Sequence, residues 1–574
     1  MRRKPQAADG TGTLPDRPLW PPRRVVVTLL SLATATVMVR AGLLEPVVGA
    51  VVDQAVRNII TLILCFSGLV SLVLWFVRES GHATAVKRGV VGGILAAVAI
   101  GAAVLRIERV SGDLVPEFAF RWSPSRDRRL PRAATPRPPG NDAADAAAAA
   151  DSWRATPRDS WRFLGPDGSA SITFPELDPD WEGRPPRQVW RRPIGAGWSG
   201  FSTCGDHAVT LEQRGDEEII SCCSVTTGEP EWSIAVPARH ETVLGGVGPS
   251  STPTIRDGVV YATGATGWLH AIDGATGRVV WKKNVLTDLG IDAAAHAASV
   301  AWGRAGSPLV MDDVVVVPGG GPRRPADPDS AAVSLVAYDR ATGDRRWTAG
   351  DEQISYCTPA LTRFGGRDVL LALNEGSVVG YDPADRRAIL RFAWAGHSNS
   401  DASCSQPVVV SDRRILVSKG YGIGAAVFEL PDAGGEAASS DGQPPLQLRE
   451  VWHETANLKT KFTNVAVHDG HAYGLSDGIL ECVRIEDGRR MWKGGRYGQG
   501  QVLRVGGFLL VQAESGEVVL VDAAPGRHSV RGRFPAIEGQ TWNNPCLAGS
   551  LLLVRNAEEA ACYELPLAGS TARP

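Results

Sequence analysis

A short pattern recurs along this chain: a strand, a turn closed by Gly, and a second strand that carries Trp four residues after the Gly. Its clear copies are residues 221–232, 270–281, 336–347 and 481–492. Self-similarity at a period of about 40 to 50 residues is typical of a repeat architecture, and strand–turn–strand content at that period predicts the blades of a β-propeller.

Weaker copies extend the repeat to eight units. The last strand of each unit is expected around Trp190, Trp232, Trp281, Trp347, Leu390, Trp452, Trp492 and Val530. The strand at Trp190 has no partner before it, and an open ring would leave two exposed sheet edges. We therefore expect this strand to complete the blade that contains Cys562 and Tyr563, which closes an all-β, eight-bladed propeller.

A second repeat predicts the inner strand of each blade. An apolar strand follows a polar residue and a proline at Pro253, Pro308, Pro359, Pro407 and Pro545. Proline is tolerated at the first residue of a strand, which is where each copy has it. The polar residues before these prolines are expected near one mouth of the central channel.

The motif Ala-x-Asp-x-x-Thr-Gly-x-x-x-Trp, intact from Ala271 to Trp281 and from Ala337 to Trp347, resembles that of the PQQ-like β-propeller repeat proteins. This family includes the quinoprotein alcohol dehydrogenases and the propeller lipoprotein of the outer-membrane barrel assembly machinery. The lead-in 161–168 (Trp-Arg-Phe-Leu-Gly-Pro-Asp-Gly) resembles that of membrane-tethered members common in planctomycete-type bacteria. The resemblance covers about residues 161–566 and implies the fold rather than an activity, because one fold hosts many functions.

Three apolar runs, 25–39, 59–77 and 89–105, precede the propeller and predict about three transmembrane helices. Six basic residues lie in 1–24, so the positive-inside rule places the N-terminus in the cytoplasm. Three spans put the propeller outside the cytoplasmic membrane, on the periplasmic side. If the first run is instead a surface helix, two spans invert this topology; a cleaved signal peptide is the other alternative for that run.

These patterns divide the chain into a basic tail (1–24), a membrane region (25–109), a Pro- and Ala-rich flexible linker (110–160), the propeller (161–566) and a tail (567–574). Residues 1–140 hold 19 Lys and Arg against 9 Asp and Glu, and residues 141–574 hold 41 against 53. An acidic propeller is poorly suited to bind nucleic acid.

The adjacent Cys222 and Cys223 invite a catalytic interpretation, since the family resemblance implies a vicinal disulfide packed against the quinone in the dehydrogenases. The repeat instead places Cys222 in a small, buried strand position. The same position holds Ala271, Ala337, Cys482 and Cys562. Cysteine at such a position behaves as a small hydrophobe.

A bound quinone would also need a calcium ion and an Asp base. The aspartates of the repeat occupy its turn, where the side chain caps the backbone. They are Asp273, Asp339, Asp382 and Asp522. No CxxC motif and no His at metal-ligand spacing is present. We therefore expect no catalytic residue, no metal site and no cofactor.

The candidates for binding lie outside the repeated core positions, because function collects in loops on a rigid scaffold. They are Trp198, Gln213, Arg214, Trp302, Ser307, Gln406, Lys461, Asn464, Gln501, Trp542 and Asn543. The sequence thus favours a membrane-anchored binding or scaffolding module of the cell envelope, with a protein or an envelope polymer as partner. The alternative is a PQQ-dependent or sugar-directed oxidoreductase that uses PQQ with calcium.

Overall fold

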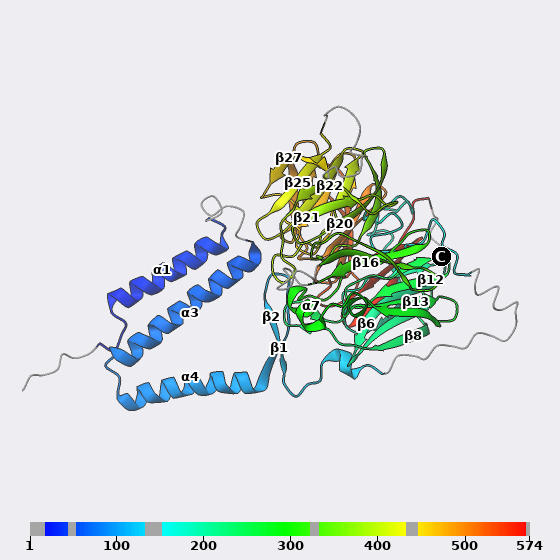
Figure 1. Cartoon of the computed structure of the whole chain (residues 1–574). Coiled ribbons are helices and arrows are strands. Elements are labelled where there is room, and N and C mark those ends of the chain that lie inside the picture. Colours follow the sequence, from blue (N-terminus) through cyan, green and yellow to red (C-terminus); the bar gives the residue numbers. More distant parts are fainter. Residues whose placement is uncertain (1–17, 44–52, 132–151, 322–331, 432–445, 570–574) are drawn as a thin grey trace, which may run out of the picture. The chain divides into compact units, whose positions relative to one another are not determined.

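The computed structural model describes residues 18–43, 53–131, 152–321, 332–431 and 446–569. The chain forms two compact units. The first, Met1–Ile107 with Glu117–Ser123, holds the N-terminal helices, and the second, Glu108–Pro116 with Pro124–Pro574, holds the propeller (Figure 1). The predicted linker 110–160 includes the undescribed residues 132–151, and its described parts carry ordered structure, including η2 (Arg126–Arg129).

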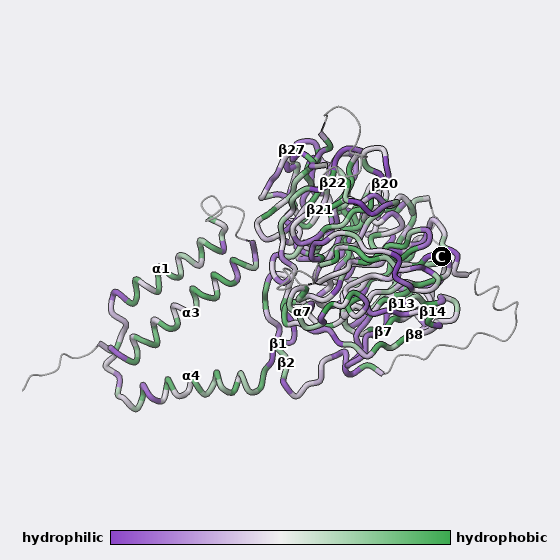
Figure 2. The backbone as a smooth tube through the Cα atoms, viewed as in Figure 1, coloured by the Kyte–Doolittle hydropathy of each residue, from purple (hydrophilic) through white to green (hydrophobic). Residues whose placement is uncertain are grey.

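The first unit contains α1 (Arg23–Arg40), α3 (Gln54–Arg78) and α4 (Thr84–Val104). Asp53 caps α3, since its carboxylate accepts a hydrogen bond of 2.8 Å from the Val56 amide. Among the described helices, α3 and α4 are long and apolar enough to cross a membrane, and Figure 2 shows hydrophobic residues along much of both. The 18-residue α1 packs against α3 and contains three arginines, and it is not among these candidates, so a third span stays a prediction.

The second unit is a ring of eight blades, each with four antiparallel strands, as the sequence predicted. Seven blades are continuous in sequence. They are β5–β8 (Ser202–Cys204, His207–Arg214, Glu217–Ser224, Pro230–Pro237), β11–β14 (Thr254–Arg256, Val259–Thr263, Trp268–Asp273, Val279–Asn284), β15–β18 (Leu309–Val310, Val314–Gly320, Val333–Asp339, Arg345–Ala349), β19–β22 (Ala360–Phe364, Arg367–Leu373, Ser377–Tyr381, Ala388–Ala393), β23, β24, β25 and β27 (Val408–Ser411, Arg414–Lys419, Gly424–Glu429, Arg449–Glu454), β28–β31 (Ala466–His468, His471–Ser476, Ile479–Arg484, Arg490–Arg496), and β32–β35 (Gln501–Val505, Phe508–Gln512, Glu517–Asp522, Val530–Pro535).

The eighth blade closes the ring. It joins β36 (Cys546–Ala548), β37 (Leu551–Arg555) and β38 (Glu559–Glu564) to β4 (Arg187–Pro193) from the other end of the domain. Cys562 pairs with Trp190, and Tyr563 pairs with Gln188. The predicted closure by the strand at Trp190 is therefore confirmed.

Besides η2, the propeller unit contains several short elements in addition to the four main strands of each blade. They are β3 (Ser171–Ile172), β9 (Glu241–Thr242), β10 (Gly246–Val247), α6 (Val285–Asp288) and α7 (Ala293–Ser299). The strand β26 (Leu446–Gln447) adds to the outer edge of the β19–β22 blade. A hairpin of β1 (Leu105–Val110) and β2 (Pro116–Phe120) contains the boundary between the two units.

Contacts between neighbouring blades explain why Trp and Gly repeat together. The Trp190 indole donates a hydrogen bond of 2.7 Å to the Val225 carbonyl of the next blade. Its ring lies where a Cβ on Gly228 would come within 2.6 Å, and Gly228 has φ of +74°. The same Trp-to-carbonyl bond recurs at Trp232, Trp281, Trp452 and Trp492. The glycine is therefore required both by its backbone conformation and by the indole that covers it.

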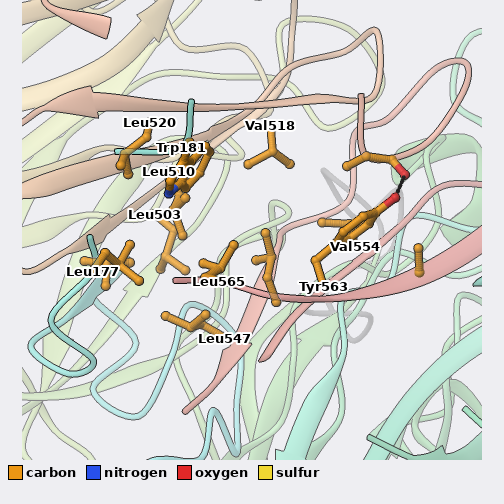
Figure 3. Packing of buried hydrophobic residues seen from close by; sticks show 14 of the residues in the cluster. Leu177, Trp181, Leu503, Leu510, Val518, Leu520, Leu547, Val554, Tyr563 and Leu565 are labelled. Carbon is orange, nitrogen blue, oxygen red and sulfur yellow. Dashed lines mark hydrogen bonds between the residues drawn. The ribbon is translucent and has the colours of Figure 1, made fainter. Parts of the chain in front are cut away.

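Apolar side chains fill the space between adjacent blades. Figure 3 shows one such core, which contains Leu510 and Leu520 of the β32–β35 blade together with Val554 and Tyr563 of the closing blade. Trp181, from the segment before β4, joins the same cluster. Closure of the ring therefore buries a continuous apolar layer and does not rest on strand pairing alone.

The segment before β4 lies along the inner strands of the ring. The strand β3 pairs in parallel with the inner edge of β32. Ser160 donates to the Leu547 carbonyl at 2.7 Å, and the Trp161 carbonyl accepts from the Ile255 amide at 2.8 Å. Residues 160–172 therefore bond to the inner strands of four successive blades, β32, β36, β5 and β11.

The propeller has two faces, which we define by their connections. The turn face carries the turns between the first and second strands of each blade, and residues 158–159 bond to two of these turns. The loop face carries the links between successive blades and the loops between second and third strands. The prolines before β11, β15, β19, β23 and β36 open inner strands at the loop face, as predicted.

Candidate functional site

The polar residues at the start of the inner strands form a ring that joins each blade to the next. The Thr252 amide donates to Ser307 Oγ at 2.9 Å, and the Ser307 amide donates to Thr358 Oγ1 at 3.0 Å. Further round, the Gln406 amide donates to Asn464 Oδ1 at 3.1 Å. Ser307, Gln406 and Asn464 thus lie near the channel mouth as predicted, but their buried side chains hold blades together.

Two other predicted residues of this ring, Gln501 and Asn543, donate hydrogen bonds through their side-chain nitrogens but accept none from the described residues. Gln501 donates to the carbonyls of Phe462 and Trp542 at 3.1 and 2.9 Å. Asn543 donates to the carbonyls of Gly197 and Ser199. The side-chain oxygens Gln501 Oε1 and Asn543 Oδ1 are buried and have no partner among the described residues. Such acceptors in a native protein are normally satisfied by water.

Three aromatic side chains meet at the channel mouth on the loop face. The ring centroids of Trp198 and Trp542 are 4.7 Å apart, and those of Phe462 and Trp542 are 4.6 Å apart. All three residues lie in links between blades. The predicted Trp198 and Trp542 therefore converge, together with Phe462.

A carboxylate connects this aromatic cluster to the chain segment that follows α4. Glu514 Oε1 accepts from Trp542 Nε1 at 3.0 Å and from the Gly112 amide at 2.8 Å. A Cβ on Gly112 would lie 2.2 Å from Gln499 Cγ, so the hairpin tip needs glycine at this contact. Glu514 has no repeat signature, and nothing in the sequence marked it.

The same segment makes two more bonds to the loop face. The Val110 carbonyl accepts from Gln540 Nε2 at 2.9 Å, and Arg109 pairs with Glu558 at 2.8 Å. Burial raises the pKa of Asp113 in the same tip, and the nearby carboxylates of Asp477 and Glu514 raise it further. The residues Glu108–Pro116 thus cover the loop-face mouth of the channel within the propeller unit.

The four remaining predicted residues make separate contacts. The Trp302 amide donates to the Tyr356 hydroxyl at 3.2 Å, and its ring packs in a separate apolar cluster. Gln213 bonds to the Ala238 carbonyl, and Arg214 pairs with Glu212 at 2.9 Å. Lys461 is buried beside Phe462. These four residues therefore do not form one site.

A short hairpin on the loop face exposes two apolar side chains. Val243 and Leu244, between β9 and β10, are 65% and 46% exposed. The following Gly245 accepts a hydrogen bond of 2.6 Å from Trp198 Nε1, and a Cβ there would be 3.0 Å from Trp302 Cε3. Trp198 and Trp302 thus support an exposed apolar tip, which was absent from the predicted candidates.

The two adjacent cysteines lie in different interblade cores. The Cys222 side chain packs with Trp232 and Val260 toward the next blade. The Cys223 side chain packs with Trp190 and Cys562 toward the closing blade. Both are free thiols in a strand, with side chains on opposite sides. The burial of Cys222 agrees with its predicted role as a small core residue.

A cleft of ≈ 660 Å³ lies on the turn face between the fifth and sixth of the continuous blades. Its lining is strongly charged, and several of its charged groups are paired. Glu429 bonds to Arg414 at 2.7 Å and to Arg449 at 2.6 Å, and Arg484 pairs with Asp487. This cleft therefore resembles a solvated seam between blades more than a site built for one ligand.

The model of the family described as outer membrane protein assembly factor BamB matches residues 186–300 and 215–494. No curated protein matches the sequence. Among solved structures, a europium-containing methanol dehydrogenase has a TM-score of 0.52 at 11% identity, covering 71% of this chain and 98% of its own. The quinohemoprotein alcohol dehydrogenase from Comamonas testosteroni has a TM-score of 0.52 at 12% identity, with 75% and 85% covered. BamB from Moraxella catarrhalis has a TM-score of 0.47 at 14% identity, with 66% and 100% covered. At these identities the structural likeness concerns the fold alone.

Proposed function

We propose that this chain, which belongs to the propeller family described as outer membrane protein assembly factor BamB, is a membrane-anchored binding module that holds a protein partner on its loop face. The family model and the apolar helices α3 and α4 support a membrane-associated propeller. We further propose that α1 is a third span, so that the basic N-terminal tail lies in the cytoplasm and the propeller lies in the cell envelope, on the periplasmic side of the cytoplasmic membrane.

The observation that carries this proposal is the apolar tip of Val243 and Leu244 on its tryptophan support. Among the large exposed apolar side chains of the described residues from 152 to 569, Val243 and Leu244 are the only two adjacent in sequence. Rigid apolar anchors are typical of the centre of a protein interface, because they bury area with little loss of conformational entropy. A partner with an apolar pocket would fit this tip.

The central channel supports the same conclusion. Residues 160–172 bond to the inner strands that line it in four successive blades, and the aromatic cluster with Glu108–Pro116 lies at its loop-face end. A quinone held in the channel would have to displace these segments. The adjacent cysteines also lie in separate cores, so they do not fit a vicinal disulfide against a cofactor.

Site-specific photo-crosslinking in the full-length, membrane-embedded protein tests this proposal. We expect a photoreactive residue at Val243 to give a discrete protein adduct, and Leu244→Asp to abolish it. Val280 is 41% exposed on the outer strand β14 and provides the matched control position. Equal adducts from positions 243 and 280, or an adduct that survives Leu244→Asp, would contradict the assignment of the tip.

The oxidoreductase alternative has the fold likeness to the two dehydrogenases in its favour. It is tested separately by adding PQQ and Ca²⁺ to the purified full-length protein and measuring dye reduction with alcohols and sugars. We expect no reduction above the rate of a heat-denatured sample. Substrate-dependent reduction would replace the binding-module proposal.

A further inference from the structure

A group of three metal-ligating side chains lies in the β5–β8 blade. His207, Cys222 and Glu231 come from three successive strands, and their ligand atoms all lie within 4.8 Å of one another. His207 Nδ1 is 2.7 Å from Glu231 Oε2, and Cys222 Sγ is 3.4 Å from the same oxygen. The three atoms therefore already converge on one small volume.

A β-bulge explains how residues of three strands converge. The register between β7 and β8 shifts after Cys222, which pairs with Trp232, while Cys223 pairs with Pro230. Glu231 is the extra residue of this bulge. Bulges re-aim side chains, and here Glu231 turns toward Cys222 and toward His207 at the start of β6.

The other blades show that this combination is not part of the repeat. The same bulge occurs in each of them, but no other blade holds His, Cys and Glu together at the three equivalent positions. Examples are Val259, Ala271 and Val280 in the β11–β14 blade, Leu551, Cys562 and Val189 in the closing blade, and His471, Cys482 and Met491 in the β28–β31 blade. Among the eight blades, the bulge residue is a glutamate in the β5–β8 blade alone.

The lead-in segment fixes the orientation of the histidine. His207 Nε2 lies 3.0 Å from Ser152 Oγ, and the imidazole stacks on the Trp153 ring at 4.5 Å with an interplanar angle of 11°. A hydrogen bond to one ring nitrogen fixes which nitrogen faces a metal, as in most metal-binding histidines. Ser152 therefore directs Nδ1 toward Cys222 and Glu231.

We propose that His207, Cys222 and Glu231 bind a thiophilic divalent transition-metal ion of the Zn²⁺ class. Nitrogen, sulfur and carboxylate oxygen are all ligands that Zn²⁺ accepts, whereas Mg²⁺ and Ca²⁺ prefer oxygen alone. Cys222 is buried, while the side chains of His207 and Glu231 are 15% and 28% exposed. The site is therefore closed on the blade side and open to solvent for a fourth ligand.

The sequence predicted no metal site because the three ligands lie on different strands and form no spacing motif. Binding would release the thiol proton of Cys222 and the proton that joins His207 Nδ1 to Glu231, because both ligands must be deprotonated. A bound ion would also link the strands β6, β7 and β8 to one another. Through His207 it would link the segment at Ser152 and Trp153 to the same site.

Titration of the purified full-length protein with Co²⁺ tests this inference. Cobalt substitutes for zinc in such sites, and a cysteine ligand gives a thiolate-to-cobalt charge-transfer band in the near ultraviolet. We expect this band in the wild type and in Cys223→Ala, the matched control with the neighbouring buried thiol. Cys222→Ala should remove it, and alanine fits this position because Ala271 and Ala337 already occupy its equivalents.

Two further variants keep the test independent of the cysteine. His207→Ala should weaken Co²⁺ binding by at least about 10-fold, and Ser152→Ala should weaken it by about 10-fold through the loss of the orienting bond. The thermal unfolding of each metal-free variant shows that the fold is retained. The inference is overturned if saturating Co²⁺ gives no charge-transfer band in the wild type, or if the band persists in Cys222→Ala.

Discussion

Replacement of Trp190 by Ala should destabilise the propeller strongly, although Trp190 lies at the first strand of the ring. The side chain is 8% exposed, and it packs between the closing blade and the next one. A tryptophan buries about 150 to 250 Å², which at ~25 cal/mol per Å² corresponds to about 4 to 6 kcal/mol. Partial collapse around alanine brings the expected loss of unfolding free energy to about 3 to 5 kcal/mol.

The hydrogen bond of the indole adds to this loss. Trp190 Nε1 donates to the buried Val225 carbonyl, and an unpaired buried acceptor costs about 1 to 3 kcal/mol. Urea unfolding of the full-length protein in detergent, followed by near-ultraviolet circular dichroism, measures the effect. Trp232→Ala, at the equivalent position of a continuous blade, should lower the free energy of unfolding by a similar amount.

Trp122 provides the negative control, because its side chain is 68% exposed. Trp122→Ala should change the free energy of unfolding by no more than about 0.5 kcal/mol. If Trp190→Ala unfolds at the same urea concentration as Trp122→Ala, the closing strand contributes nothing to stability and the reasoning is refuted.

Three more predictions follow from individual residues. Gly277→Ala should lower the free energy of unfolding by more than about 2 kcal/mol, and Gly215→Ala should lower it by about 1 kcal/mol. Both glycines have positive φ, but of the two only Gly277 has an indole 2.7 Å from the position of an added Cβ. Urea unfolding of both variants measures the difference. Burial raises the pKa of Glu218 to about 7, so the folded state binds the proton more tightly than the unfolded state, and stability should fall by up to about 3 kcal/mol as the pH rises from 4.5 to 7. Glu218→Gln should flatten that pH dependence, and an unchanged slope would show that another group causes it. A reporter that is active only in the periplasm should be active when fused after Pro574 and silent near His82, whereas the reverse pattern would place the propeller in the cytoplasm.

The fold was predictable because its determinants are local and repeated. Gly228 and the three equivalent glycines fix a left-handed turn, and the tryptophan four residues later docks on the next blade, so each copy specifies both a hairpin and an interblade contact. Pairing of Trp190 with Cys562 followed from the need to remove two sheet edges.

The sites were less predictable because their parts come from distant segments. Trp198 and Trp542 could be selected as aromatics outside the repeat, but Phe462 and Glu514 join them only through the closed ring. Several predicted polar residues, such as Ser307, form their hydrogen bonds with the neighbouring blade. Sequence spacing carries no signal for contacts of this kind.

The way the ring closes also sets an order of events during synthesis of the chain. Arg191 in β4 and its partner Tyr563 in β38 are 372 positions apart. At about 5 to 20 residues per second, β4 leaves the ribosome roughly 20 to 75 s before β38 exists. During this interval β4 is an open edge that other strands can pair with. The nascent domain therefore needs protection of this strand until the last blade is made.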